Sequence, residues 1–242
     1  GQGQALMGKL KQFYIYVIRW LGRLLAALHI LPLIDRHRHI RWCHWFSSLF
    51  AIHDLERMLT FDVPWWTYKA IDQVEAFCQA NPDIRAFEYG SGASTICLAK
   101  RCQRVDSVEH DAGWYGYLTN SLAEFDNVSL TLVEPDDADQ NEPTSYRSGK
   151  HGYTDKSFRR YASAIDQTDG QYDLIVIDGR ARNACLDHAL SRLSARGIVV
   201  FDNSWRGRYK PAIAASGLNS TVHTGLTPCL PVPDQTTILR HR

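Results

Sequence analysis

The sequence predicts an α/β fold in which a doubly wound, mostly parallel sheet of seven strands, the last of them antiparallel, follows an amino-terminal helical arm. Three observations support this prediction. Short apolar runs alternate with helix-like segments from residue 61 onward. Several of these runs end in an acidic residue, and a glycine-rich turn follows the first run. The predicted strands are residues 85–88, 105–108, 128–133, 172–178, 197–202, 220–224 and 236–239.

Helix signals lie between these runs. Pro64 is placed to start the helix before the first strand, because proline is favoured in a first helical turn. The predicted helices are residues 66–79, 96–101, 158–165, 181–193 and 209–216. Residues 134–157 are polar and too long for an ordinary connection. We therefore expect this segment to be a substrate loop or lid.

The first strand ends in an acid and a tight glycine turn. Glu88 closes the strand, and Gly90 and Gly92 allow positive φ and a close approach of backbone to a ligand. Ser94 and Thr95 can cap the helix that follows. Thr95 stands where a dinucleotide-binding fingerprint has its third glycine, which disfavours NAD. A carboxylate directly before the turn favours a ligand with an amino group over one with phosphates.

A second acid lies at the spacing expected for a nucleoside site. The apolar run 105–108 ends in Glu109, which lies 19 residues beyond Gly90. At this place a doubly wound sheet carries the carboxylate that accepts hydrogen bonds from ribose hydroxyls. His110 follows directly, and we expect Trp114 to lie against an adenine face.

The segments Glu88-Tyr-Gly-Ser-Gly-Ala-Ser and Val108-Glu109-His-Asp resemble those of class I S-adenosylmethionine-dependent methyltransferases, which have a Rossmann-like fold. The resemblance covers residues 61–242. It implies that Glu88 faces the methionine end of S-adenosylmethionine and that Glu109 holds the ribose. From the aromatic residues upstream of the first strand, we expect Tyr68 to face the cofactor. The expected cofactor-binding residues are Glu88, Gly90, Ser91, Gly92, Ser94, Thr95, Glu109, His110, Trp114, Tyr68 and Asp178.

Two further acids and an amide follow the fourth and fifth strands. Asp178 ends one strand, and Asp202 and Asn203 end the next, so all three are expected at the ligand-binding edge. These oxygen ligands suit Mg²⁺ or a similar divalent cation. The triplet resembles that of metal-dependent catechol and caffeoyl-coenzyme A O-methyltransferases, in which the metal grips the substrate hydroxyls. The alternatives are that Asp178 caps a helix or bonds the cofactor, and that Asp202 and Asn203 form only a turn.

The sequence departs from the catechol pattern at the base. Those enzymes have a lysine three residues after the first metal-binding acid, whereas this chain has Ala181. Arg180 and Arg182 remain protonated and are poor bases, but they can bind an anionic substrate. We expect the catalytic residues to be Asp178 and His151, the latter from the loop, because histidine titrates near neutral pH.

Composition indicates a globular enzyme rather than a nucleic-acid-binding protein. The chain has 242 residues, 45% of them hydrophobic, and a net charge of +1. This charge gives no global attraction to nucleic acid. The six cysteines contain no Cys-x-x-Cys pair, so we expect reduced thiols and a cytoplasmic protein.

The amino-terminal arm, residues 1–60, is the basic part of the chain, with eight Lys and Arg against three Asp and Glu. Residues 1–6 are interpreted as a tag remnant. The apolar stretch 8–34 contains Arg19 and Arg23, each costing about 2.5–3.5 kcal/mol at a bilayer centre, and Pro32 is expected to end its helix. A spanning helix is therefore not expected. An amphipathic helix on the inner face of a membrane, and a helix packed on the catalytic domain or in a homodimer, remain as alternatives.

Taken together, the residues predict methyl transfer from S-adenosylmethionine to a hydroxyl of a small molecule, assisted by a divalent metal. The arginines favour an anionic acceptor and the basic arm favours a lipid-linked one. One alternative is a metal-independent O- or N-methyltransferase. Another is a non-catalytic module that binds S-adenosylmethionine and docks partners or membrane through residues 1–60.

Overall fold

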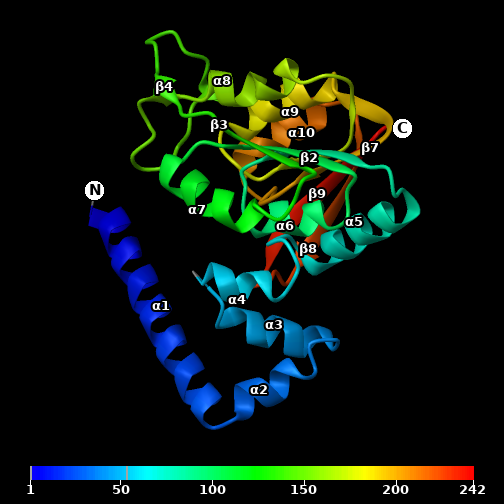
Figure 1. Ribbon diagram of the computed structural model, residues 1–242. Helices are drawn as coiled ribbons and strands as arrows, with labels where there is room; N and C mark the ends of the chain where they lie inside the picture. Colours follow the sequence, from blue (N-terminus) through cyan, green and yellow to red (C-terminus); the bar gives the residue numbers. More distant parts are fainter. Residues whose placement is uncertain (1, 53) are drawn as a thin grey trace.

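A computed structural model describes residues 2–52 and 54–242, with side chains for residues 12–52, 54 and 56–242. The chain forms a seven-stranded sheet in the order β3-β2-β1-β6-β7-β9-β8 (Figure 1). Only β9 runs antiparallel to its neighbours β7 and β8, so the predicted fold class is confirmed. The strands are β1 Arg85–Tyr89, β2 Arg104–Glu109, β3 Val128–Leu132, β6 Tyr172–Ile177, β7 Leu193–Phe201, β8 Asn219–Gly225 and β9 Asp234–Arg240.

Helices cover both faces of the sheet because its central strands are apolar on both sides. Every residue of β6 is buried, as expected for a central parallel strand. In β1, Phe87 and Tyr89 pack toward α8 (Arg159–Ala162) and α9 (Arg182–Leu190), whereas Ala86 packs toward α5 (Tyr68–Ala80). Successive side chains of a strand point to opposite faces of the sheet, so β1 contributes to the hydrophobic core on each face.

The remaining helices mostly confirm the sequence pattern, with two differences. Helix α6 is Ala93–Ala99, α10 is Lys210–Ala215, and the segment predicted as one helix over 158–165 is α8 followed by the 3₁₀ turn η2, Ser163–Gln167. Helix α7, Ala112–Leu122, was not predicted. Its start carries a clear signal, since the Asp111 carboxylate accepts a hydrogen bond from Trp114 N at 2.9 Å.

The long polar segment 134–157 folds over the carboxyl edge of the sheet. Its ends pair as two short antiparallel strands, β4 Asp136–Asp137 and β5 Lys156–Ser157, and it contains the 3₁₀ turn η1, Thr144–Tyr146. An ion pair of 3.0 Å between Arg159 and Glu142 ties it to α8. The segment is therefore an ordered flap with its own backbone pairing.

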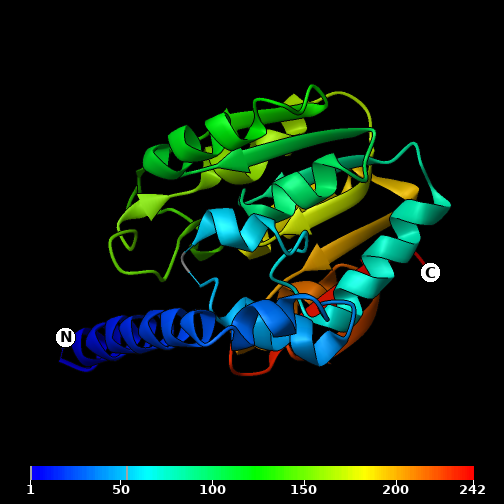
Figure 2. The same ribbon diagram turned by 60° about the horizontal axis from the view of Figure 1, so that its bottom comes forward.

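The amino-terminal arm consists of α1 Gln2–Ala27, α2 Ile30–Asp35, α3 Arg41–Leu49 and α4 Leu55–Leu59. Contrary to expectation, the first helix ends at Ala27, before Pro32, and His29 between the two helices adopts a φ of 59°. Pro32 instead lies in the first turn of α2, where its missing N–H costs nothing. Figures 1 and 2 show α1 extending away from the sheet domain.

The arm is anchored to the sheet domain through α3. Trp45 Nε1 donates to Leu230 O at 2.9 Å, and Cys229 N donates to Ser48 Oγ at the same distance. These contacts join the arm to the turn between β8 and β9. Within residues 2–52 and 54–242, we find no helix long and apolar enough to cross a bilayer. The proposed tag remnant, residues 1–6, and the basic side chains of Lys9 and Lys11 lie outside the described side chains.

Candidate active site

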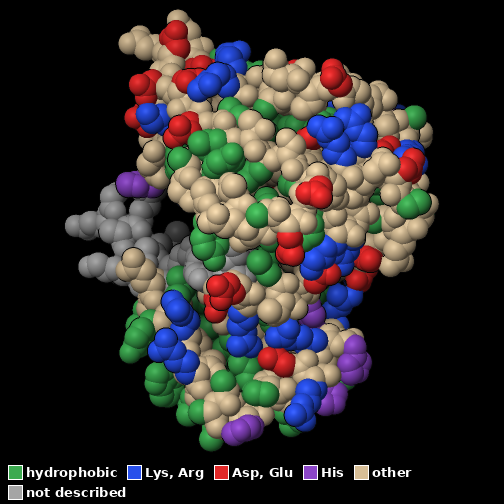
Figure 3. All heavy atoms as spheres, in the orientation of Figure 1, with side chains coloured by type: hydrophobic (Ala, Val, Ile, Leu, Met, Phe, Trp, Pro, Cys, Tyr) green, Lys and Arg blue, Asp and Glu red, His purple; other side chains and the backbone are tan. Residues whose placement is uncertain are grey.

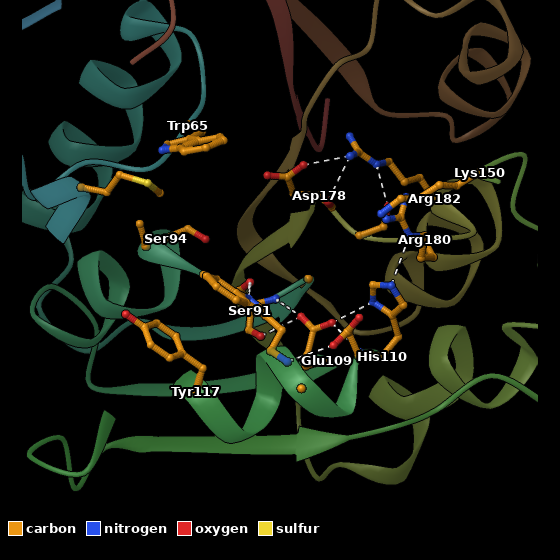
Figure 4. Close-up of a pocket in the computed structure, with 18 residues that line it drawn as sticks. Trp65, Ser91, Ser94, Glu109, His110, Tyr117, Lys150, Asp178, Arg180 and Arg182 are labelled. Carbon is orange, nitrogen blue, oxygen red and sulfur yellow. Dashed lines mark hydrogen bonds and ion pairs between the residues drawn. The ribbon is translucent and has the colours of Figure 1, made fainter. Parts of the chain in front are cut away.

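A cavity of about 870 Å³ opens at the carboxyl ends of β1, β2 and β6. This is the edge at which an open α/β sheet binds ligands, and the volume is typical of a small-molecule site. Figure 4 shows Ser91 and Glu109 on one side of it, Asp178 and Arg182 on another, and Trp65 facing them. The wall consists of Met58, Trp65, Gly90, Ser91, Gly92, Ala93, Ser94, Glu109, His110, Asp111, Gly113, Trp114, Tyr117, Lys150, Asp178, Gly179, Arg180 and Arg182.

The floor of the cavity is a backbone contact between two strand ends. Gly90, directly after β1, has a φ of 95°, which only glycine adopts readily. A Cβ atom at Gly90 would lie 2.8 Å from the Cα atom of Gly179, which follows β6. Neither loop could retract without breaking the Asp178 N to Tyr89 O hydrogen bond of 3.0 Å. The predicted glycine turn is thus required by the packing of the two loops.

Glu88 lies behind this floor rather than in the cavity wall. Its carboxylate is fully buried and accepts hydrogen bonds from the hydroxyls of Ser94, Thr95 (2.6 Å) and Ser107 (2.7 Å). Burial raises its pKa to about 7, although the three hydroxyl donors oppose the rise. Thr95 is also fully buried and accepts from Gly92 N at 2.9 Å. The two residues therefore hold the glycine turn in place instead of lining the cavity as expected.

The raised pKa of Glu88 predicts a pH-dependent stability. Folding favours the protonated form, so the free energy of unfolding falls as pH rises from the ordinary value of 4.5 to about 7. Glutamine does not ionise, so Glu88→Gln does not lose stability in this way. The free energy of unfolding of Glu88→Gln, minus that of the wild type, should therefore rise by up to about 3 kcal/mol between pH 4.5 and about 7. Urea unfolding at several pH values measures the difference.

The control for this measurement is Glu124→Gln, which changes an exposed carboxylate. Its stability should differ from the wild type by the same amount at every pH. If the Glu88→Gln and wild-type curves run parallel from pH 4 to 8, Glu88 is not a titrating buried acid.

Glu109 is the ionised carboxylate of the site. It is 3% exposed, and its Oε2 accepts from Ser91 N (3.2 Å) and Ser91 Oγ (2.8 Å). Its Oε1 accepts from the backbone N–H groups of His110 (2.8 Å) and Asp111 (2.9 Å). Burial alone would raise its pKa, but these bonds and the neighbouring His110 ring outweigh it and lower the pKa. Glu109 thus offers a fixed negative charge on the cavity wall.

Aromatic and basic groups continue this wall. Trp114 Nε1 donates to Ser91 O at 2.9 Å, and its ring stacks on Tyr117 at 5.6 Å between centroids. His110 Nδ1 lies 2.8 Å from Glu109 Oε1 but is not aligned for a hydrogen bond, while its Nε2 accepts from Arg180 Nε at 3.3 Å. Glu109, His110 and Arg180 therefore form a connected polar wall.

The opposite wall is built on an ion pair between Asp178 and Arg182. Asp178 Oδ1 lies 2.9 Å from Arg182 Nη2, and 26% of the Asp178 side chain is exposed to the cavity side. Arg182 is 7% exposed and also donates to the backbone oxygens of Gly179, Asp178 and Asp202. Burial raises the pKa of Asp178, and the Arg182 charge opposes this rise. Arg182 therefore fixes the acid in position.

The geometry does not support the predicted Mg²⁺ site at Asp178, Asp202 and Asn203. Asp202 is 3% exposed, and its Oδ1 accepts from Thr236 Oγ1 at 2.7 Å. Asn203 turns its amide nitrogen, not its oxygen, toward Asp202 (2.9 Å) and Asp234 (2.7 Å). Within the described residues, no group of three His, Cys, Asp or Glu side chains could hold a metal. The cation paired with Asp178 is the Arg182 guanidinium, which bonds Asp202 only through its backbone oxygen.

The assignment of Arg182, rather than a metal ion, as the cation beside Asp178 can be tested. Arg182→Ala leaves Asp178 without its cation and should lower the free energy of unfolding by about 3–5 kcal/mol, since it breaks a largely buried pair. Mn²⁺ should then restore part of the loss in Arg182→Ala and leave the wild type unchanged. Thermal unfolding with and without Mn²⁺ measures both effects.

Arg160→Ala is the matched control, because Arg160 pairs with Asp136 at the surface and both side chains are exposed. It should lose at most about 1 kcal/mol and should not respond to Mn²⁺. Saturable binding of Mn²⁺ to the wild type, measured by calorimetry, would contradict the assignment.

Several predicted site residues lie elsewhere. The Tyr68 hydroxyl bonds His44 Nδ1 at 2.7 Å, and Tyr68 is not part of the cavity wall. His151 is exposed and also outside the wall, whereas its neighbour Lys150 is in it. Trp65, upstream of the first strand, takes the place expected for Tyr68. The sequence contains these candidate residues, but it does not show in which direction their side chains point.

Comparison with known proteins agrees with the site. Residues 87–204, which span the glycine turn, Glu109, Asp178 and Asp202, match a family described as a methyltransferase domain. Together with the strand order described above, the match supports a class I S-adenosylmethionine-dependent methyltransferase. No curated protein sequence matches it.

Solved structures share the fold at low sequence identity. TrmN from Thermus thermophilus is 13% identical, with a TM-score of 0.50 over 71% of this chain and 48% of that one. A methyltransferase-like protein from Silicibacter pomeroyi is 21% identical, with a TM-score of 0.49 over 70% and 86%. Precorrin-6y C5,15-methyltransferase from Geobacter metallireducens is 14% identical, with a TM-score of 0.46 over 70% and 88%. At these sequence identities the likeness concerns the fold alone.

Proposed function

We propose that the protein transfers the methyl group of S-adenosylmethionine to a hydroxyl of a small molecule, with an arginine–aspartate pair in place of a resident metal. The main support for this proposal is that two acidic side chains, Glu109 and Asp178, lie on two walls of one cavity. Glu109 is held ionised by four donors, and Asp178 is held by Arg182. The first suits a nucleoside and the second a reacting hydroxyl.

The cofactor would lie across the glycine turn. Glu109 already accepts four hydrogen bonds, which fill its favourable acceptor directions, so ribose hydroxyls would bond Oε2 by replacing the Ser91 hydroxyl there. The bent backbone at Gly90 and Gly92 leaves room for the ligand next to the floor. Trp65 presents an apolar face that can contact a cationic sulfur through its π-system. The cavity of about 870 Å³ is large enough for this ligand and an acceptor.

S-adenosylmethionine supplies a methyl group already activated for transfer, so the protein mainly aligns the acceptor. Asp178 would accept the hydrogen bond of the acceptor hydroxyl and take its proton as the oxygen bonds the methyl carbon, while the sulfur–methyl bond breaks and S-adenosylhomocysteine leaves as the neutral thioether. Arg182 keeps the Asp178 carboxylate oriented through its bond to Oδ1. The buried position of Asp178 raises its pKa and makes it a better proton acceptor than an exposed aspartate.

Two substitutions separate binding from chemistry. Glu109→Gln should weaken binding of S-adenosylhomocysteine about tenfold or more, because it removes a charged acceptor. Asp178→Asn should bind S-adenosylhomocysteine nearly as well as the wild type but lower kcat about 10²–10⁴-fold, the usual contribution of a general base. Calorimetry and a radiolabelled methyl-transfer assay with a panel of hydroxylated acceptors measure the two effects.

Glu124→Gln, far from the cavity wall, should change neither quantity. Equal affinity of Glu109→Gln and wild type for S-adenosylhomocysteine would contradict the cofactor placement. Tight binding without turnover on any acceptor would instead favour the non-catalytic binding module.

We further propose that the outer face of α1 contacts an anionic membrane surface. Among its described side chains, Phe13, Tyr16, Trp20 and Leu24 recur at helical spacing and are 40–71% exposed. Exposed arginines, Arg19 and Arg23, flank this apolar stripe. Figure 3 shows basic and hydrophobic side chains together on the amino-terminal helices. Apolar residues bordered by arginine are typical of a helix that lies in a lipid interface.

Vesicle co-sedimentation tests this contact. The wild type should bind vesicles that contain phosphatidylglycerol and bind pure phosphatidylcholine weakly. The double variant Trp20→Glu/Leu24→Glu should bind about tenfold less, because two charges replace apolar anchors.

Trp205→Glu is the matched control, since Trp205 is 57% exposed on the sheet domain. Its binding should equal that of the wild type. Vesicle binding that is the same for all three proteins contradicts the proposal. A dimer in sedimentation analysis that Trp20→Glu/Leu24→Glu dissociates would assign the face to a second copy instead.

A further inference from the structure

A second cavity, of about 590 Å³, adjoins the first one and is lined by cationic side chains. The flap contributes Arg147 and Lys150, the segment after β6 contributes Arg180 and Arg182, and the segment after β7 contributes Arg206 and Arg208. None of the described residues in its wall is Asp or Glu. Because the whole chain has a net charge of +1, this is a strong local concentration of positive charge.

Neutral groups, rather than carboxylates, hold most of these arginines. Arg147 Nη2 donates to Asp139 O at 2.7 Å, Arg180 Nε donates to His110 Nε2, and Arg208 Nη2 donates to Tyr209 Oη at 3.1 Å. In the described part of the chain, Arg182 is the one arginine of this wall with a carboxylate oxygen within 4.0 Å. Apart from Arg182, the arginines of this wall therefore carry positive charges that no carboxylate among the described residues neutralises.

Polar atoms of the wall also lack partners. Arg147 Nε and Asn183 Oδ1 are buried and make no hydrogen bond among the described residues. The arginines lower the pKa of Tyr209. Burial alone would raise this pKa, but the nearby Arg182, Arg208 and Arg206 outweigh burial. A ligand with several anionic oxygens would give Arg147 Nε an acceptor and would offset the positive charge around Tyr209, whereas Asn183 Oδ1, itself an acceptor, would need a ligand hydroxyl as donor.

We infer that this second cavity binds a phosphoryl or diphosphoryl group of the methyl acceptor. A carboxylate carries one charge and is matched by a single bidentate arginine. Six cations from three separate segments suit a group that carries about two charges and three or more acceptor oxygens. The hydroxyls of Ser145 and Ser148 in the same wall add neutral donors of the kind that phosphates use.

The two cavities share Lys150, Gly179, Arg180 and Arg182, so an acceptor anchored in the second can reach Asp178 in the first. Figure 4 shows Lys150, Arg180 and Arg182 gathered on the Asp178 side of the first cavity. The inference rests on the proposed function for the identity of the reacting group. The anion site itself stands on the arginines alone and is testable without turnover.

Calorimetry of the full chain with inorganic pyrophosphate, at constant ionic strength, tests the site. The wild type should bind pyrophosphate more tightly than acetate. Arg206→Gln/Arg208→Gln should weaken pyrophosphate binding about tenfold or more, since hydrogen bonds to charged groups are lost. The same variant should bind S-adenosylhomocysteine like the wild type, because neither arginine lines the first cavity.

Arg19→Gln/Arg23→Gln is the matched control. These arginines are exposed on α1 and line neither cavity. If this variant loses as much pyrophosphate affinity as Arg206→Gln/Arg208→Gln, or if neither loses any, the second cavity is not an anion site. Loss of S-adenosylhomocysteine binding with intact pyrophosphate binding would sink the proposed function and leave the anion site standing.

The phosphate can come from a soluble ester or from a lipid headgroup. If Arg206→Gln/Arg208→Gln also lowers binding to vesicles that contain phosphatidic acid, the source is a lipid headgroup. If vesicle binding is unchanged while pyrophosphate binding is lost, the source is a soluble phosphate ester. Both results support the anion site.

Discussion

The structure of the site depends on the contact between the backbones at Gly90 and Gly179. A Cβ at Gly90 would come within 2.8 Å of Gly179, and one at Gly179 would collide with the Tyr161 hydroxyl. The ends of β1 and β6 can therefore meet only as two glycines. The contact between these two strand ends places two acids in the walls of one cavity. They are Glu109, which accepts a hydrogen bond from Ser91, and Asp178, which precedes Gly179. The hydroxyl cluster around Glu88 supports this arrangement from below.

Three acids at one sheet edge acquire different roles from their surroundings. Burial among hydroxyls favours the protonated form of Glu88, whereas backbone N–H donors keep Glu109 ionised. Asp178 is partly exposed and tied to a buried arginine. Glu88 thus stabilises the turn, Glu109 carries a fixed negative charge on the cavity wall, and Asp178 is the acid to which we assign the acceptor hydroxyl in the proposed function. The surroundings of each acid, rather than whether it is Asp or Glu, determine which form of it is favoured.

Much of this was predictable from the sequence because strand ends in a parallel sheet converge. The alternation of strands and helices, the glycine turn and the spacing of Glu109 depend on local patterns that survive folding. The arginines of the second cavity could not be predicted as a group, since Arg147 and Arg206 meet only through the folding of the flap. Arg182 carried a signal, its spacing of four from Asp178, but whether an arginine or a metal neutralises that acid depends on side-chain direction.

The most direct test of the account is a crystal structure with S-adenosylhomocysteine. The account predicts that the ribose hydroxyls bond Glu109, that the backbone of Gly90–Gly92 contacts the ligand, and that the sulfur lies on the Asp178 side of the cavity. A ligand bound elsewhere, or in this cavity without contact to Glu109, would contradict it.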